Sequence, residues 1–336
     1  MKRALLLLMG LCALTGLTLL VHGRTTSEPV SVQETITGDW TAKVRQTEKE
    51  PVLWLSLSRN REKKERGWFQ SSQDFPLREF SGLNPNANAS VQFTLMREAG
   101  TIFFDGLFKD GKGVGDFRFT PNGNYVGAMR NLGYDGLATE KLFSLTLFDV
   151  STKYINELKL LGYEKISVDK LIAMRIHRVD GEYIRRMQAL GYKDLSADKL
   201  TAMRIHGVDE AFINEAAALG FRDLPIDKLL AMRIHKVDAE FITKAKALGF
   251  GEMTLDRLMA MRIHGIDEEY VKSVQAMGYQ NVPFEKLLSM RIHGVDSKFV
   301  KEMREQGYAN LSVDDLINLR IHGIDGSYVR RMRGNR

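Results

Sequence analysis

The stretch GYKDLSADKLTAMRIHGVDEAFI at residues 191–213 is nearly one whole copy of a unit that fills the second half of the chain. Its Arg-Ile-His triplet occurs six times, with consecutive starts 29 residues apart. A fixed period with two helical stretches per unit is typical of an α-solenoid, in which each unit buries its apolar face against its neighbours. The triplets begin at Arg175, Arg204, Arg233, Arg262, Arg291 and Arg320.

Capping residues predict where the two helices of a unit begin and end. Asp180 is a good N-cap for a first helix over 181–190, and Gly191 suits the left-handed position that follows. Ser196 likewise caps a second helix over 197–206. Helices of about ten residues are unstable alone in water, so their order is expected to depend on stacking.

The apolar residues of each unit fall at helical spacing. In the second helix we expect Leu200, Met203 and Ile205 to form the buried face. The ends of the array depart from the pattern: residues 122–150 lack the triplet and are predicted to be a degenerate capping repeat. Regular repeats follow over 151–329, with a basic tail at 330–336.

Alternation of apolar and polar residues predicts a β-rich domain over 34–121. The fold class expected is therefore α+β with two domains: an antiparallel β-meander, sandwich-like, followed by an α-solenoid of 29-residue helix-turn-helix repeats. Gly111, Gly113 and Gly115 do not make a phosphate-binding loop, because a strand rather than a helix follows them. The expected strands are Asp39–Arg45, Val52–Ser58, Ser90–Met96, Thr101–Phe108 and Val114–Thr120.

The N-terminus has the layout of a secretory signal peptide over 1–23, with a linker at 24–33. Lys2 and Arg3 precede an apolar run at 4–21, which is also just long enough to be an uncleaved membrane anchor. Both interpretations export the rest of the chain. We expect a secreted or periplasmic protein or, as the alternative, one anchored in the inner membrane by residues 4–21.

Charge and cysteine content exclude several classes of protein. The chain has 48 basic and 42 acidic side chains, a net charge of +6 that falls to +4 without residues 1–23. This mild excess is not the basic footprint of a nucleic-acid-binding protein. The single cysteine, Cys12, lies in the apolar run, so neither disulfides nor thiolate metal clusters are expected in the exported part.

No catalytic constellation is apparent, so the expected function is not enzymatic. His-Glu-x-x-His, Gly-x-Ser-x-Gly and Walker motifs are missing from the sequence. A carboxylate pair in the β-rich domain, such as Asp105 and Asp116, remains as an alternative, but nothing in its context distinguishes these residues from hairpin surface residues. No cofactor is expected.

One histidine per repeat invites a metal-site interpretation, which the spacing disfavours. Equivalent residues of stacked repeats should lie about 10 Å apart, whereas zinc needs nitrogen ligands at about 2 Å. We expect the rings at the C-terminal turn of the second helix, where they can meet free carbonyls and the helix dipole. The six residues are His177, His206, His235, His264, His293 and His322.

The arginine of each triplet has two interpretations. It can build a hydrogen-bonded ladder that fixes the register between repeats, with Asp169 or Asp180 as the carboxylate partner of Arg175. Alternatively, the arginines line a concave surface that binds carboxylates, acidic glycans or phosphates.

Surface positions of the first helix vary between repeats and lean basic. In repeat proteins such a face is where partners bind, so we predict a partner-binding face here; a merely solvated outer face is the alternative. Its residues are Arg185, Arg186, Lys244, Lys246, Lys272, Lys301 and Arg304.

The repeat unit resembles the helical repeats in extracytoplasmic tails of bacterial membrane metallopeptidases of the antibiotic-sensor, antirepressor type. The resemblance covers about 125–329 and implies a bacterial envelope protein that senses or binds. This chain lacks the His-Glu-x-x-His zinc site and the multiple membrane spans of those proteases, so proteolysis is not carried over.

Together these observations predict a non-enzymatic extracytoplasmic binding or scaffold protein. Its helical repeats would recognise another envelope protein or an acidic polymer, but not nucleic acid, and would meet the membrane only through an uncleaved N-terminal segment. A structural spacer, or an enzymatic or small-ligand site in the β-rich domain, remain as alternatives.

Overall fold

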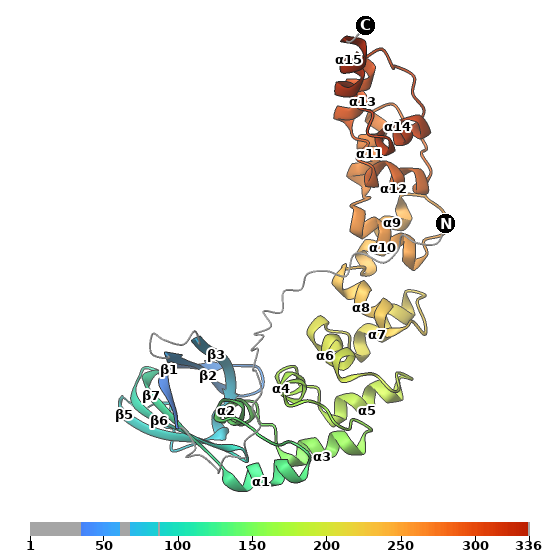
Figure 1. Cartoon of the computed structure of the whole chain (residues 1–336). Coiled ribbons are helices and arrows are strands. Elements are labelled where there is room, and N and C mark those ends of the chain that lie inside the picture. The colour runs from blue at the N-terminus through green and yellow to red at the C-terminus, as the bar shows by residue number, and fades with distance from the viewer. Residues whose placement is uncertain (1–34, 61–67, 87, 335–336) are drawn as a thin grey trace, which may run out of the picture.

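The computed structural model describes residues 35–60, 68–86 and 88–334. A curled β-sheet is followed by an array of short helices that leads away from it to the C-terminus (Figure 1). The predicted α+β class is confirmed. The expected signal peptide and linker lie outside the described residues, as do the last two residues of the basic tail.

Seven strands form one antiparallel sheet in the order β3-β2-β1-β7-β6-β5-β4. Two of them, β3 and β4, were not expected from the sequence. Among the described residues β3 pairs only with β2, and its Gln-Ser-Ser-Gln centre at 70–73 lacks the apolar alternation of a strand. The strands are β1 (Ile36–Gln46), β2 (Pro51–Asn60), β3 (Trp68–Pro76), β4 (Phe80–Ser81), β5 (Ala89–Arg97), β6 (Gly100–Lys109) and β7 (Lys112–Pro121).

The sheet curls around an aromatic core and shares it with the first helices. Trp40 is fully buried on the inner face and meets Phe93 edge-on at 5.2 Å between ring centres. At one end of the sheet, Phe143 from α2 (Thr139–Leu147) stacks on Phe117 of β7 at 5.6 Å. The sheet and the start of the helical array therefore form one continuous hydrophobic core.

The glycines that looked like a phosphate-binding loop serve the sheet instead. A Cβ atom at Gly113 would lie 2.6 Å from the Trp40 ring, and one at Gly115 would lie 2.0 Å from the carbonyl oxygen of Asp105. Only glycine lets β7 pass this close to the indole and to β6.

Each repeat contributes a first and a second helix, as the capping residues predict. The Asp180 carboxylate accepts a hydrogen bond from the backbone N–H of Tyr183 at 2.8 Å, which is an N-cap. The first helices are α1 (Gly123–Asn131), α3 (Thr152–Leu160), α5 (Gly181–Ala189), α7 (Glu210–Ala218), α9 (Ala239–Ala247), α11 (Glu268–Ala276), α13 (Ser297–Glu305) and α15 (Gly326–Gly334). The second helices are α2, α4 (Val168–Ile176), α6 (Ala197–His206), α8 (Ile226–Ile234), α10 (Leu255–His264), α12 (Phe284–Ile292) and α14 (Val313–Ile321).

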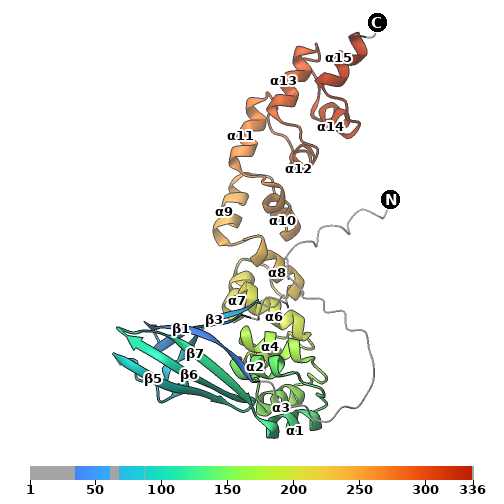
Figure 2. The same ribbon diagram turned by 60° about the vertical axis from the view of Figure 1, so that its left-hand side comes forward.

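The array winds about its long axis. In Figure 1, α4 lies to the left of α5 near the sheet, whereas α14 lies to the right of α13 near the C-terminus. Figure 2 shows the array from another side, again leading away from the sheet. No helix within the described ranges is both long and apolar enough to cross a bilayer; the apolar run at 4–21 is not among them.

Candidate binding surfaces

The triplet arginines form a ladder between repeats. Each Nε donates a hydrogen bond to a backbone carbonyl at the end of the preceding second helix, where a cation also meets the negative end of the helix dipole. The bonds run from Arg175 to Phe148 (3.1 Å), Arg204 to His177 (3.0 Å), Arg233 to Gly207 (3.0 Å), Arg262 to Lys236 (2.9 Å), Arg291 to His264 (2.9 Å) and Arg320 to His293 (2.9 Å).

Each of these guanidinium groups also lies over an aromatic ring of the first helix in its own repeat. Such a cation–π contact contributes about 0.5–2 kcal/mol, depending on desolvation. The distances to ring centres are 5.1 Å for Tyr154, 4.9 Å for Tyr183, 4.1 Å for Phe212, 4.0 Å for Phe241, 4.6 Å for Tyr270 and 5.1 Å for Phe299. One arginine per repeat therefore ties three helices together.

The expected carboxylate partners of the arginine are wrong. Asp169 forms an ion pair with Lys141 of the preceding second helix, and Asp180 caps α5. Arg175 instead pairs with Asp149, 2.6 Å away. For the other five arginines the described residues place no carboxylate within ion-pairing distance.

The histidine backbone, rather than the ring, takes part in the ladder. His177, His264 and His293 accept the arginine bonds through their carbonyl oxygens. Each histidine stands at the C-terminal end of its second helix, as expected, but within the described ranges no imidazole bonds a carbonyl there. No group of three or more metal-binding side chains comes together among those residues. Burial lowers the pKa of His177.

A second ladder, absent from the sequence predictions, joins the N-terminal ends of the second helices. A cation of one helix pairs with an acid in the first turn of the next, where the helix dipole favours a negative charge. Its sequence signature is the Asp-Lys pair that recurs with the repeat. The pairs are Lys141–Asp169, Lys170–Asp198 (2.7 Å), Lys199–Asp227 (3.0 Å), Lys228–Asp256, Arg257–Glu285 (3.1 Å) and Lys286–Asp314.

The predicted basic face of the first helices is mostly neutralised by its own acids. Arg304 instead donates to the Met277 carbonyl at 2.5 Å across a repeat boundary, and Lys246 is exposed. A face of exposed ion pairs presents little net charge to a partner. Its pairs are Arg185–Glu157 (3.1 Å), Arg186–Glu182 (2.5 Å), Lys244–Glu240 (2.6 Å), Lys272–Glu268 (2.6 Å) and Lys301–Glu305 (4.0 Å).

The isoleucine of each triplet points outward. The expectation that Ile205 joins the buried face is wrong, because residues two apart on a helix point in nearly opposite directions. Met203 is fully buried while Ile205 is 53% exposed. We call this set the isoleucine row: Ile176 (46% exposed), Ile205 (53%), Ile234 (52%), Ile263 (53%), Ile292 (52%) and Ile321 (52%).

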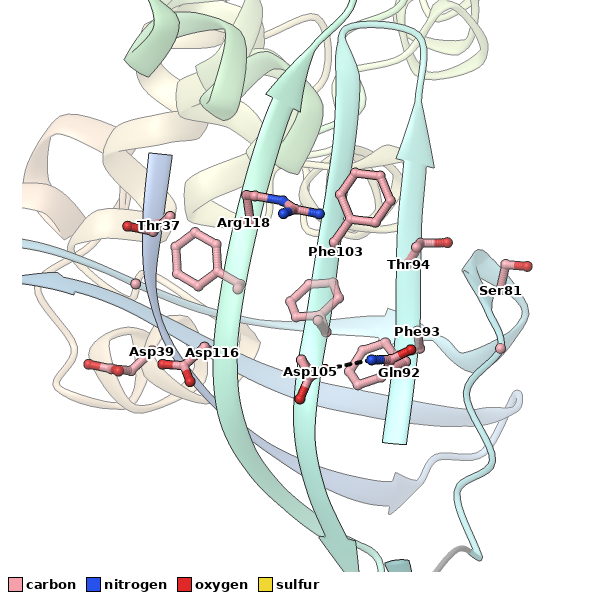
Figure 3. A pocket seen from close by; sticks show the side chains of 14 residues that line it. Thr37, Asp39, Ser81, Gln92, Phe93, Thr94, Phe103, Asp105, Asp116 and Arg118 are labelled. Atoms are coloured by element: carbon pink, nitrogen blue, oxygen red, sulfur yellow. Dashed lines mark hydrogen bonds between the residues drawn. The ribbon is translucent and has the colours of Figure 1, made fainter. Parts of the chain in front are cut away.

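The outer face of the sheet carries an open groove of about 990 Å³ over β1, β7, β6 and β5 (Figure 3). Asp116 lies directly opposite Asp39 on one side and Asp105 on the other. The Asp105 carboxylate accepts a hydrogen bond from Gln92 at 2.7 Å. These carboxylates form a row across the strands.

The next row of the groove is apolar and cationic. Arg118 and Phe103 stand on neighbouring strands, and the guanidinium lies 5.3 Å from the ring centre. Phe103 is 38% exposed, so its ring is accessible from solvent. The structure thus brings together the carboxylates noted in the sequence, whereas Asp39, Arg118 and Phe103 join them only through strand register.

No protein-family model, curated protein or solved structure matches this chain. The surfaces described above therefore carry the functional argument on their own.

Proposed function

We propose that this chain is a non-enzymatic binding or scaffold protein of the cell envelope, whose helical array recognises another macromolecule through the last turn of the second helices. The observation that carries the proposal is the isoleucine row: six residues, about half exposed and identical in every regular repeat.

An exposed residue that never varies between repeats needs a reason, because repeats of one chain are free to diverge wherever packing does not constrain them. The two preceding positions have structural reasons, because Met203 is buried and Arg204 holds the ladder. The histidine that completes the triplet is equally invariant, and in three repeats its backbone carbonyl accepts the ladder bond. Exposed first-helix positions do vary, as in Arg185, Asn214 and Thr243. A repeated apolar contact on a ligand explains why isoleucine is retained at an outward position.

This proposal moves the binding surface away from the first helices. There the expected cations are largely engaged by acids one helical turn away or on the preceding repeat. A partner would have to break those pairs before using their charge. The partner classes stay as the sequence suggests: another envelope protein or an acidic polymer, met outside the cytoplasm.

A small-ligand site in the β-sheet groove is the second candidate function. An accessible phenyl ring beside a guanidinium, a carboxylate row and the Gln92 amide could hold a small polar ligand with an apolar face. The spacer alternative assigns no contact to either surface.

The test is a pull-down from envelope extract with the purified chain and two variants that carry three substitutions each. One has Ile205→Ser, Ile234→Ser and Ile263→Ser; the matched control has Lys244→Ser, Lys246→Ser and Lys272→Ser on the first helices. We expect a specific partner to be lost only with the isoleucine variant, with unchanged circular dichroism. Loss only with the control would return binding to the first helices. Equal capture of a partner by the parent chain and both variants, or capture of no partner by any of them, would overturn the proposal.

A further inference from the structure

We propose that the isoleucine row binds an extended polypeptide segment in which apolar and acidic side chains recur every third residue. This rests on the proposed function and adds the chemistry and conformation of the partner. Three features support it: arginines beside the row that pair with no carboxylate of the described residues, the spacing of the repeats, and the winding of the array.

The charge beside the isoleucine row is positive, and within the described residues no carboxylate neutralises most of it. Arg204, Arg233, Arg262, Arg291 and Arg320 stand on the same last turn as the isoleucines. Each uses Nε in the ladder, and the described part of the chain offers none of them an ion-paired carboxylate. A guanidinium has five N–H donors in a fork that fits a carboxylate, so most of each donor set is left for a partner.

Arg175 shows how such a guanidinium meets a carboxylate. Its Nε donates a hydrogen bond to the Phe148 carbonyl, while a terminal nitrogen donates to the Asp149 carboxylate at 2.6 Å. An acidic side chain of a partner can occupy the equivalent place on the following repeats without disturbing the ladder. The complementary partner is therefore anionic.

The spacing of the repeats selects the conformation of the partner. Stacked helices lie about 8–10 Å apart, so the isoleucines and arginines recur at about that interval. A polyproline II helix has three residues per turn and rises about 3.1 Å per residue, or roughly 9 Å per turn. Every third side chain then lies on the same side of the ligand. One side meets the isoleucines, a second meets the arginines, and the third faces solvent.

A flat anionic membrane fits this surface poorly. The second helices pass from one side of the first helices to the other along the array (Figure 1), so their last turns do not lie in one plane. A narrow single chain can contact successive second helices one at a time along a winding row, whereas a bilayer would meet only part of it.

The experiment measures fluorescence anisotropy of a labelled peptide of five Leu-Pro-Glu triplets, titrated with the full chain. Two matched peptides serve as controls: one with every Glu replaced by Gln, and one of the same composition with the period destroyed. We expect saturable binding of the first peptide that weakens about tenfold or more with either control. The variant with Ile205→Ser, Ile234→Ser and Ile263→Ser should show a similar loss. The Glu-to-Gln peptide tests the arginines without altering the ladder they stabilise.

Equal binding of all three peptides, or of the variant and the parent chain, overturns the inference. Binding to vesicles with anionic headgroups that depends on the isoleucines, without peptide binding, also overturns it in favour of a lipid surface. An isoleucine-dependent partner in the pull-down, with no peptide binding, removes this inference and leaves the proposed function standing. If there is neither an isoleucine-dependent partner in the pull-down nor peptide binding, both this inference and the proposed function are overturned.

Discussion

The side-chain Nε of Arg204 donates a hydrogen bond to the backbone carbonyl oxygen of His177, 3.0 Å away across a repeat boundary. The same guanidinium lies 4.9 Å from the ring centre of Tyr183. Because short helices depend on their neighbours, a bond that crosses the boundary stabilises the interface on which both repeats rely.

Arg204→Lys should lower the stability of the array by about 1–2 kcal/mol. A lysine cannot place a planar group over Tyr183 and hold the His177 carbonyl at the same time. The measurement is the urea midpoint followed by circular dichroism. The matched control is Lys199→Met, which removes the exposed pair with Asp227 and should cost at most about 1 kcal/mol. Equal losses of stability in the two variants would show that the arginine ladder contributes no more than an exposed ion pair.

Lys236→Gly should stabilise the chain by about 1 kcal/mol. Lys236 has φ +54°, a left-handed conformation that is costly for a side chain with a Cβ atom. Its carbonyl, which accepts from Arg262, is a backbone group and is kept. Thermal unfolding measures the gain. The reverse change at an equivalent position, Gly265→Ala, should destabilise, since Gly265 has φ +62° and a new Cβ would lie 3.3 Å from a terminal nitrogen of Arg291.

Local signals allowed the helices to be predicted closely, and packing decided the rest. The second helix expected at 197–206 is α6, because Ser196 and Gly207 mark its ends by local chemistry. The partner of Arg204 could not be found in this way, because it depends on how far one repeat is displaced along the next. The outward position of Ile205 is predictable from the sequence, because a residue two positions after the buried Met203 points to nearly the opposite side of the helix.

In the sheet, alternation predicted the strands that bury one face and missed β3, whose central residues 70–73 are all polar. The groove on the outer face of the sheet could not be predicted from the sequence, for a different reason. Asp39 and Asp116 are 77 positions apart in sequence, and only the register of β1 on β7 makes them neighbours. The polar residues of an outer face have no hydrophobic pattern from which the strand register could be predicted.

High pH should destabilise the repeats nearest the sheet. Burial raises the pKa of Tyr183 to about 12, against a partial lowering by Arg204, and burial also raises the pKa values of Tyr125 and Tyr154. Unfolded tyrosines ionise near pH 10, so above about pH 10 the folded state holds protons that the unfolded state has lost. Stability is therefore complete below about pH 10 and falls as the pH rises through the folded-state pKa values.

Tyr183→Phe should reduce the loss of stability at high pH. The part of that loss due to Tyr183 is on the order of 2–3 kcal/mol. Phenylalanine fits, because Phe212 stands at the same position of the next repeat. At neutral pH the variant should lose about 1 kcal/mol, as the Val208 carbonyl loses the tyrosine hydroxyl that now donates to it at 3.2 Å. Urea midpoints at about pH 7 and pH 11 separate the two effects. An unchanged difference between the two pH values would contradict the assignment.

Asp116→Asn should stabilise the sheet, because Asp116 stands between two like charges. Asp39 and Asp105 lie directly opposite it on the adjacent strands, and like charges in such pairs cost roughly 0.2–1 kcal/mol each. Asparagine removes both repulsions with little change of shape. Asp39→Asn is the matched control, since it removes only one of them and should give about half the gain. Both gains should shrink in high salt, because all three carboxylates are exposed and the repulsion is screened. Denaturant midpoints at low and high ionic strength make the comparison, and a salt-independent gain, or a loss, would show that repulsion across the row does not control the stability of this face.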